Sequence, residues 1–204
     1  MAFESSTRFP HAADSPAVDD RLLTAPDDPE AARRMARLRE LGVEARPYAE
    51  FDELARRLAH DVGAPDGYAM VNFIGPDQQY FAGLYAPGAG NDVAEQAVAA
   101  AASAQPGRVM ELDHGFCPHV VLGRKTWALR DVRDYPRFNS NPVVDELGIY
   151  SYIGTPLLDR DGQALGTMCV VATEAQQWDA AGVRTIKAAA EEVVQRIYQR
   201  AGLG

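Results

Sequence analysis

The segment from Asp113 to His119 concentrates residue types that bind metals or act as nucleophiles. It reads DHGFCPH and holds two of the four histidines and one of the two cysteines of the chain. Zinc accepts nitrogen, sulfur and oxygen donors, so Asp113, His114, Cys117 and His119 are candidate ligands. Their spacing matches no familiar zinc pattern, because structural zinc sites usually draw paired ligands from two separated segments. The residue types leave three interpretations open: a metal site, thiol chemistry at Cys117, and a buried Cys117 that packs as a small apolar residue.

The rest of the chain carries none of the common catalytic motifs. It has no G-x-x-x-x-G-K-[ST] loop, G-x-G-x-x-G fingerprint, H-E-x-x-H pair or G-x-S-x-G elbow. We interpret Asp131 and Arg137 as an ion pair that braces a loop, because isolated acids without an identified base or nucleophile are seldom catalytic. Cys169 lies in a strongly apolar run and is expected to pack in the core. We therefore expect a protein that is not an enzyme, with a thiol sensor or redox enzyme at Cys117 as the alternative.

Composition sets the class of protein. The chain has 204 residues, of which 47% are hydrophobic and 24% charged, so it is long enough to bury a substantial core. Its formal net charge of −9 argues against attraction to a phosphate backbone, and no nucleic-acid partner is expected. No apolar run approaches membrane-spanning length, and the N-terminal residues show no basic region followed by an apolar core, so no signal peptide is expected. With only two cysteines and no C-x-x-C pair, we expect a cytoplasmic protein without a membrane partner.

Three parts are expected along the chain. Residues 1–26 are rich in Ser, Pro, Ala and Asp and predict a flexible extension. Residues 27–48 form an N-terminal helix and linker, with the helix near 29–41 between the acidic, proline-containing start and Gly42. Residues 49–204 form the main domain with a C-terminal helix. The arginines of the first helix are expected to form a solvent-exposed face; they are Arg33, Arg34, Arg37 and Arg39.

Apolar periodicity predicts the elements of the main domain. The strongest signal is a hairpin, because Asp159–Gly162 separates two apolar runs and contains an Asp-Gly turn. Its outgoing strand has almost no polar residue and is expected to be a central strand buried on both faces. The order of helices and strands predicts an α+β fold. The expected elements are a helix at 51–62, strands at 68–74 and 79–84, a helix at 91–103, strands at 150–158 and 164–171, and a helix from Asp179 to the chain end.

The segment 131–171 resembles the C-terminal half of a GAF domain, a small-molecule sensory module of bacterial signalling proteins. The resemblance rests on several short sequence motifs that occur in the same order as in that family, and it extends over roughly 51–198. It implies a GAF/PAS-like, twisted, mainly antiparallel sheet with the terminal helices on one face and a ligand pocket on the other. These motifs are Asp131-Val132, Pro136-Arg137-Phe138, Asn141-Pro142, Tyr152-Ile153-Gly154-Thr155-Pro156-Leu157, Asp161-Gly162 and Leu165-Gly166-Thr167-Met168-Cys169-Val170.

The resemblance also implies a site and a mode of action. It places a pocket lid at 131–149 and implies a non-enzymatic sensor that binds a small molecule and signals through its terminal helices. A homodimer and a kinase or phosphatase partner are expected. The rival hypothesis is an interaction module with a filled pocket, docking through helices 29–41 and 179–200. The pocket candidates are Phe116, Cys117, His119, Phe138, Tyr150 and Tyr152.

The resemblance does not name the ligand or cofactor. Bilin-binding relatives attach the pigment through a cysteine followed directly by histidine, whereas Pro118 separates Cys117 from His119 here. The signature of cyclic-nucleotide-binding relatives is absent, since Asn141 stands where they carry phenylalanine. Haem would need an axial histidine such as His114 or His119. Free methionine sulfoxide reductases of this fold use several cysteines, and this chain has two.

Overall fold

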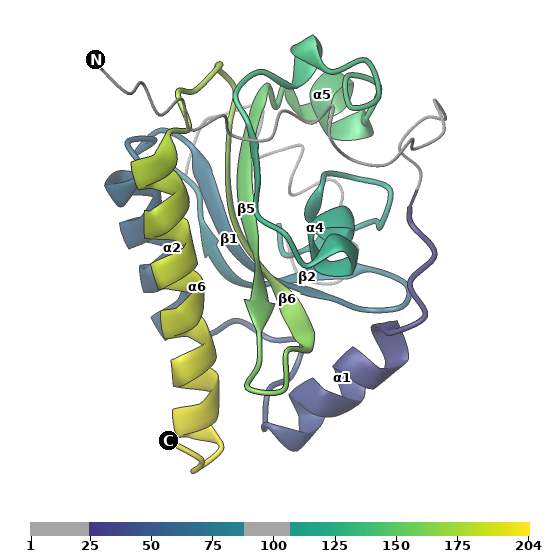
Figure 1. The fold of residues 1–204 in the computed structure, drawn as a ribbon, viewed down its shortest axis with the longest axis vertical. Helices are drawn as coiled ribbons and strands as arrows, with labels where there is room; N and C mark the ends of the chain where they lie inside the picture. Colours follow the sequence, from purple (N-terminus) through teal and green to yellow (C-terminus); the bar gives the residue numbers. More distant parts are fainter. Residues whose placement is uncertain (1–24, 88–106) are drawn as a thin grey trace, which may run out of the picture.

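A computed structural model describes residues 25–87 and 107–204. Within them lies a sheet of six strands in the order β3-β2-β1-β6-β5-β4, and every neighbouring pair is antiparallel. Figure 1 labels four of these strands, β1, β2, β5 and β6. The expected helix at 91–103 and nearly all of the expected extension 1–26 lie outside the described residues. The strands are β1 (Tyr68–Ile74), β2 (Gln79–Tyr85), β3 (Val109–Met110), β4 (Trp127–Leu129), β5 (Ser151–Leu158) and β6 (Ala164–Ala172).

The predicted hairpin is confirmed as β5 and β6, and β6 is a central strand. All residues of β6 except Val171 are buried, so the strand is covered on both faces. Asp159 organises the turn, because its Oδ1 accepts the backbone N–H groups of Asp161 at 2.9 Å and Gln163 at 2.8 Å. Gly162 has a φ of +76°, a conformation that glycine adopts without strain. The Asp-Gly turn thus fixes the register of the two strands.

Helices α2 (Ala49–Asp61) and α6 (Ala180–Arg200) cover one face of the sheet, as the resemblance implied (Figure 1). The predicted apolar stripe of α2, including Phe51, Leu54 and Leu58, is buried against the sheet. Asp179 caps α6, since its side chain accepts the N–H of Gly182 at 2.8 Å. None of the helices in the described ranges has the length and apolar character needed to cross a membrane.

The other face of the sheet carries a second buried cluster under short helices and loops. These helices are α4 (Cys117–Gly123), the 3-10 helix η2 (Val132–Asp134) and α5 (Pro142–Leu147). Alternation along the strands divides their side chains between the two clusters. In β1, for example, Val71 and Phe73 face the helix pair, whereas Met70 and Ile74 face α4 and α5.

Helix α1 (Ala31–Glu40) corrects one expectation about the arginines. Arg34 is only 1% exposed; its Nε donates to the carbonyl of Ile74 at 2.7 Å and its guanidinium pairs with Asp28. The prediction of a solvent-exposed arginine was wrong for this residue, because the carbonyl at the end of β1 and the carboxylate of Asp28 together satisfy a buried guanidinium. Arg33 and Arg39 are exposed as predicted.

Candidate functional site

A cavity of about 50 Å³ lies between the sheet and the elements around α4 and α5. Strands β1, β2, β5 and β6 supply its floor, and α4, α5 and the loop before α4 supply its walls. Among the described residues, those that line it include no Lys, Arg, Asp or Glu. The cavity can therefore receive an uncharged, largely apolar group. Within this described lining the basic side chain is His114, and both of its ring nitrogens are bound to carboxylates.

Three of the predicted pocket residues lie together in the cavity wall. Phe116, Cys117 and Tyr152 all line it, and all are buried. The rings of Phe116 and Tyr152 meet edge to face with centroids 5.1 Å apart. The sulfur of Cys117 lies 3.4 Å from the Tyr152 hydroxyl. Burial raises the pKa of Tyr152 well above its usual value of about 10, so the phenol stays protonated and can act as a hydrogen-bond donor.

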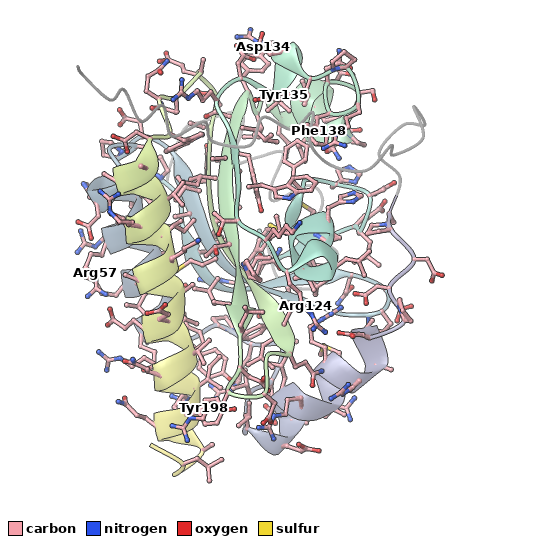
Figure 2. All side chains as sticks on the ribbon, viewed as in Figure 1. Arg57, Arg124, Asp134, Tyr135, Phe138 and Tyr198 are labelled. Atoms are coloured by element: carbon pink, nitrogen blue, oxygen red, sulfur yellow. The ribbon has the colours of Figure 1, made fainter. Side chains whose placement is uncertain are left out.

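The other three predicted residues lie outside the lining of this cavity. His119 stacks on Trp127 with ring centroids 6.0 Å apart and planes 16° from parallel. Phe138 points from the lid toward α4 (Figure 2) and packs on Phe116, with centroids 5.7 Å apart. Tyr150 lies beneath the guanidinium of Arg133, 4.2 Å from the ring centre. Phe138 thus supports the wall from behind, and ligand contact by these three residues stays a prediction.

Two buried thiols meet beneath the cavity. The sulfurs of Cys117, on α4, and Cys169, on β6, lie 3.5 Å apart, and both cysteines are free. Their hydrogen bond lowers the pKa of Cys117 to about 7 despite burial, and the same contact together with burial raises that of Cys169. Cys169 packs in the core as predicted, but its contact with Cys117 was not foreseen.

An amide pair in the cavity wall was missed by sequence reasoning. Asn72 on β1 is fully buried, and its Nδ2 donates to Oε1 of Gln79 on β2 at 2.8 Å. Both residues line the cavity. A signal was present, since Asn72 is the one amide within the otherwise apolar strand YAMVNFI, and buried amides are retained where they make specific hydrogen bonds.

The four metal-ligand candidates of segment 113–119 are not brought together. Among the described residues, the ligand atoms that lie within 4.8 Å of one another belong to Glu111, Asp113 and His114. Cys117 contacts Cys169 instead, and His119 stacks on Trp127. His114 binds Asp113 at 2.7 Å and Glu146 at 3.4 Å. Burial lowers the pKa of His114, but these two carboxylates outweigh it and the net pKa is raised.

The lid is tethered to the loop before α4 by Asn141. Its side chain accepts the N–H of Gly115 at 2.8 Å, donates to the carbonyls of Asp113 and Gly115 at 3.2 Å, and also accepts from Val143 at the start of α5. Asn141 is 1% exposed, so these bonds are shielded from water. Loop and lid are therefore expected to move as one unit.

Asp131 in the lid forms its ion pair with a different arginine from the one expected. Asp131 binds Arg133, with Nη2 to Oδ2 at 2.6 Å, and accepts the Arg133 backbone N–H at 3.0 Å. The pairing with Arg137 was wrong, because η2 turns Arg133 back onto Asp131 while the Arg137 guanidinium lies 4.4 Å above the ring of Phe138. The hydrogen bonds from Arg133 lower the pKa of Asp131.

The fold agrees with that of a known family. A family model described as the GAF domain matches residues 47–197. The chain belongs to the GAF domain family. Helix α1, which begins at Ala31, precedes the matched range and packs against the GAF domain through Arg34. The GAF fold is a sensory and regulatory one, which agrees with the class predicted from the sequence motifs.

One curated protein is similar to part of this chain. A cyclic di-GMP phosphodiesterase of Pseudomonas aeruginosa is 38% identical over 60 residues, which is 29% of this chain and 10% of that protein. The chain thus spans about a tenth of the length of that relative.

Solved structures share the fold at low identity. A GAF sensor protein from Burkholderia vietnamiensis superposes with a TM-score of 0.53 at 20% identity, over 84% of this chain and 98% of that one. The free methionine-R-sulfoxide reductase of Neisseria meningitidis gives 0.53 at 16% identity, over 90% and 98%. A reductase is thus among the proteins that share this fold, and these structures show the fold alone.

Proposed function

We propose that this GAF domain is a sensor that binds a small, uncharged organic molecule in the cavity between the sheet and α5. The observation that supports it is the cavity itself, whose described lining consists of apolar and aromatic side chains and a few polar groups, with no Lys, Arg, Asp or Glu among them. That mixture is usual in small-molecule sites. The proposal includes no chemical step, so the domain binds its ligand without converting it.

The small size of the cavity means that binding requires a conformational change. An apolar cavity of about 150 Å³ holds a benzene ring, and this one measures about 50 Å³. A ring-sized ligand therefore enters only when a wall moves. The wall formed by Val143, Leu147 and Ile149 belongs to the lid, which is a short helix between loops rather than part of the sheet. Binding then selects a lid position that the empty domain populates less.

The lid is connected to the terminal helix through β5. Residue Ser151, the first of β5, follows the lid directly, and Ile153 on the same strand lies in the cluster with Ile186 of α6. Trp178, just before α6, donates its indole N–H to the carbonyl of Leu129 on β4 at 3.1 Å. A shift of the lid is thereby passed to the start of α6. A second copy of the chain or a signalling partner would receive it there.

Thermal unfolding with a set of small uncharged compounds tests the proposal. A ligand at a hundred times its Kd stabilises the folded state by about 2.7 kcal/mol. The variant Val143→Phe fills the cavity and should abolish the shift in melting temperature. Leu122→Phe is the matched control, because Leu122 is 43% exposed on α4 and outside the lining. If a compound stabilises Val143→Phe to the same extent as the parent protein, it binds outside the cavity, and the interaction-module hypothesis is favoured.

A further inference from the structure

The hydrogen bonds of Gln79 fix how its side-chain amide is oriented. Its Nε2 donates to the carbonyl of Glu111 at 2.7 Å and to the carbonyl of His114 at 2.6 Å. Carbonyl oxygens only accept hydrogen bonds, so the NH₂ group of Gln79 must face them and its Oε1 must face Asn72. Gln79 is 1% exposed, and water does not offer its amide an alternative orientation.

The orientation of Asn72 follows from that of Gln79. Because Oε1 of Gln79 accepts, the group of Asn72 that lies 2.8 Å away must be the donor Nδ2. Oδ1 of Asn72 is then the remaining polar atom of the side chain. Among the described residues, none supplies a hydrogen-bond donor to this buried oxygen. A buried acceptor without a donor is destabilising, because the hydrogen bonds that it makes to water in the unfolded chain are not replaced.

Asn72 lies on the cavity side of the sheet, and its Oδ1 becomes accessible to a ligand only when a wall of the cavity moves. Strand β1 alternates, so Met70, Asn72 and Ile74 share the face toward α4 and α5, and Asn72 is itself one of the lining residues. The neighbouring wall includes Met70 and Phe81, which offer no strong acceptor, and Cys117, which is a weak acceptor below its pKa of about 7, where the thiol is protonated. Asn72 is thus a fixed acceptor in an apolar surrounding, where a hydrogen bond discriminates strongly between ligands.

We propose that Asn72 determines specificity by accepting a hydrogen bond from the ligand, which is an uncharged, largely apolar molecule carrying a hydroxyl or N–H donor. This inference rests on the proposed function, since it names the class of ligand that the same cavity takes. A carboxylate or phosphate ligand is disfavoured, because it would bring acceptors to Asn72 and find no Lys or Arg in the described lining. A purely aliphatic or aromatic hydrocarbon would leave the buried oxygen unpaired.

Phenol and toluene are a matched pair of probes for this class, because they have the same shape and differ by one donor. Their dissociation constants are measured by calorimetry at about pH 6, where the phenol hydroxyl and the Cys117 thiol are both protonated. Benzoate serves as the charged analogue. The parent protein should bind both neutral probes and bind benzoate at least tenfold more weakly than phenol.

The decisive quantity is the ratio of the toluene Kd to the phenol Kd in two variants. Asn72→Leu removes the acceptor at similar volume, and the ratio should fall about tenfold, as expected for one lost hydrogen bond. Met70→Leu changes the same face of the same strand and should alter both constants alike, leaving the ratio unchanged. If Asn72→Leu does not fold, Asn72→Ala removes the same acceptor in a smaller residue.

Each outcome has a separate meaning. A ratio that falls in the Asn72 variant and not in Met70→Leu supports the inference. Equal binding of both neutral probes, with a ratio that changes less than about twofold in the Asn72 variant, would show that the acceptor takes only water and would overturn it. If neither neutral probe binds the parent protein, the proposed function fails as well.

Discussion

At the scale of single residues, burial decides the ionisation of His119. The imidazole is packed against Trp127, and burial together with the nearby Arg137 lowers its pKa from 6.5 to about 4. The unfolded chain therefore binds a proton below about pH 6.5, whereas the folded protein does so only near pH 4. The contribution of neutral His119 to the free energy of unfolding is fully present above pH 6.5 and is lost as the pH falls toward 4.

The variant His119→Gln should flatten this part of the pH profile. We expect the parent protein to lose up to about 3 kcal/mol of unfolding free energy through His119 between pH 6.5 and 4, and the variant to lose correspondingly less. The raised pKa of His114 acts in the opposite direction, so the difference between parent and variant is the quantity to compare. Urea unfolding at several pH values measures it. Equal losses in both proteins would contradict the burial of a neutral His119.

The two thiols predict a specific oxidation product. Their sulfurs are 3.5 Å apart, and a disulfide needs about 2.05 Å, so a shift of roughly 1.5 Å joins them. We expect diamide to produce one intramolecular disulfide, detected as a loss of about 2 Da by mass spectrometry of the intact chain. Cys117→Ser and Cys169→Ser should each prevent it.

A disulfide-linked dimer as the main product, or two unreacted thiols, would contradict that expectation. The sequence predicted core packing for Cys169 from its apolar run, and for Cys117 it left apolar packing as one of three interpretations. It could not predict that they touch, since the contact joins α4 to β6 across 52 positions and depends on how the helix sits on the sheet. The same holds for Asn72 and Gln79, because the hydrogen bonds of Gln79 to the loop before α4 are tertiary contacts.

At the scale of elements, α1 is joined to the domain by buried polar contacts. Arg34 ties it to the end of β1, and Arg37 reaches Asp159 at 3.2 Å and the hydroxyl of Tyr198 at 3.1 Å. Tyr198 lies beside the β5–β6 turn near the end of α6 (Figure 2). Arg124 of the α4 cap also binds Glu30 at 2.6 Å. Helix α1 is thus connected to both faces of the domain.

Loss of Arg34 should therefore destabilise the whole chain. Arg34→Met removes the donors to Ile74 and leaves the half-buried Asp28 without its partner, and we expect a loss of about 3 kcal/mol in unfolding free energy. Arg33→Met is the matched control on the exposed side of α1, with an expected change within about 0.5 kcal/mol. Chemical denaturation compares the two. Equal small effects would mean that α1 is not part of the cooperative unit.

Periodicity predicted most elements because their burial is one-sided or complete. The stripe on α2, the hairpin around Asp159–Gly162 and the cap at Asp179 follow from local chemistry and are confirmed. The burial of Arg34 did not follow, because a charged residue enters a core only when its partners are already placed. The lid contacts of Arg133 and Arg137 depend likewise on the 3-10 turn, which no apolar pattern marks.

At the scale of the whole molecule, one sheet separates two buried clusters with different roles. The cluster under α2 and α6 is continuous and apolar, as expected of a structural core. The cluster under α4 and α5 contains the cavity, the thiol pair and the amide pair. The family resemblance predicted this division and the order of layers. The cavity volume and the fixed acceptor of Asn72 depend on exact packing, so the sequence could not provide them.

Methionine methyl groups report on both clusters at once. Met70 and Met110 line the cavity, whereas Met168 is fully buried in the cluster on the other face. The most direct measurement is therefore a titration with phenol of protein labelled with ¹³C in the methionine methyl groups, assigned by Met→Leu variants. Binding in the cavity should shift the signals of Met70 and Met110 in a saturable manner and move Met168 far less. Unchanged Met70 and Met110 signals, or an equal shift of Met168, would contradict a ligand site in this cavity.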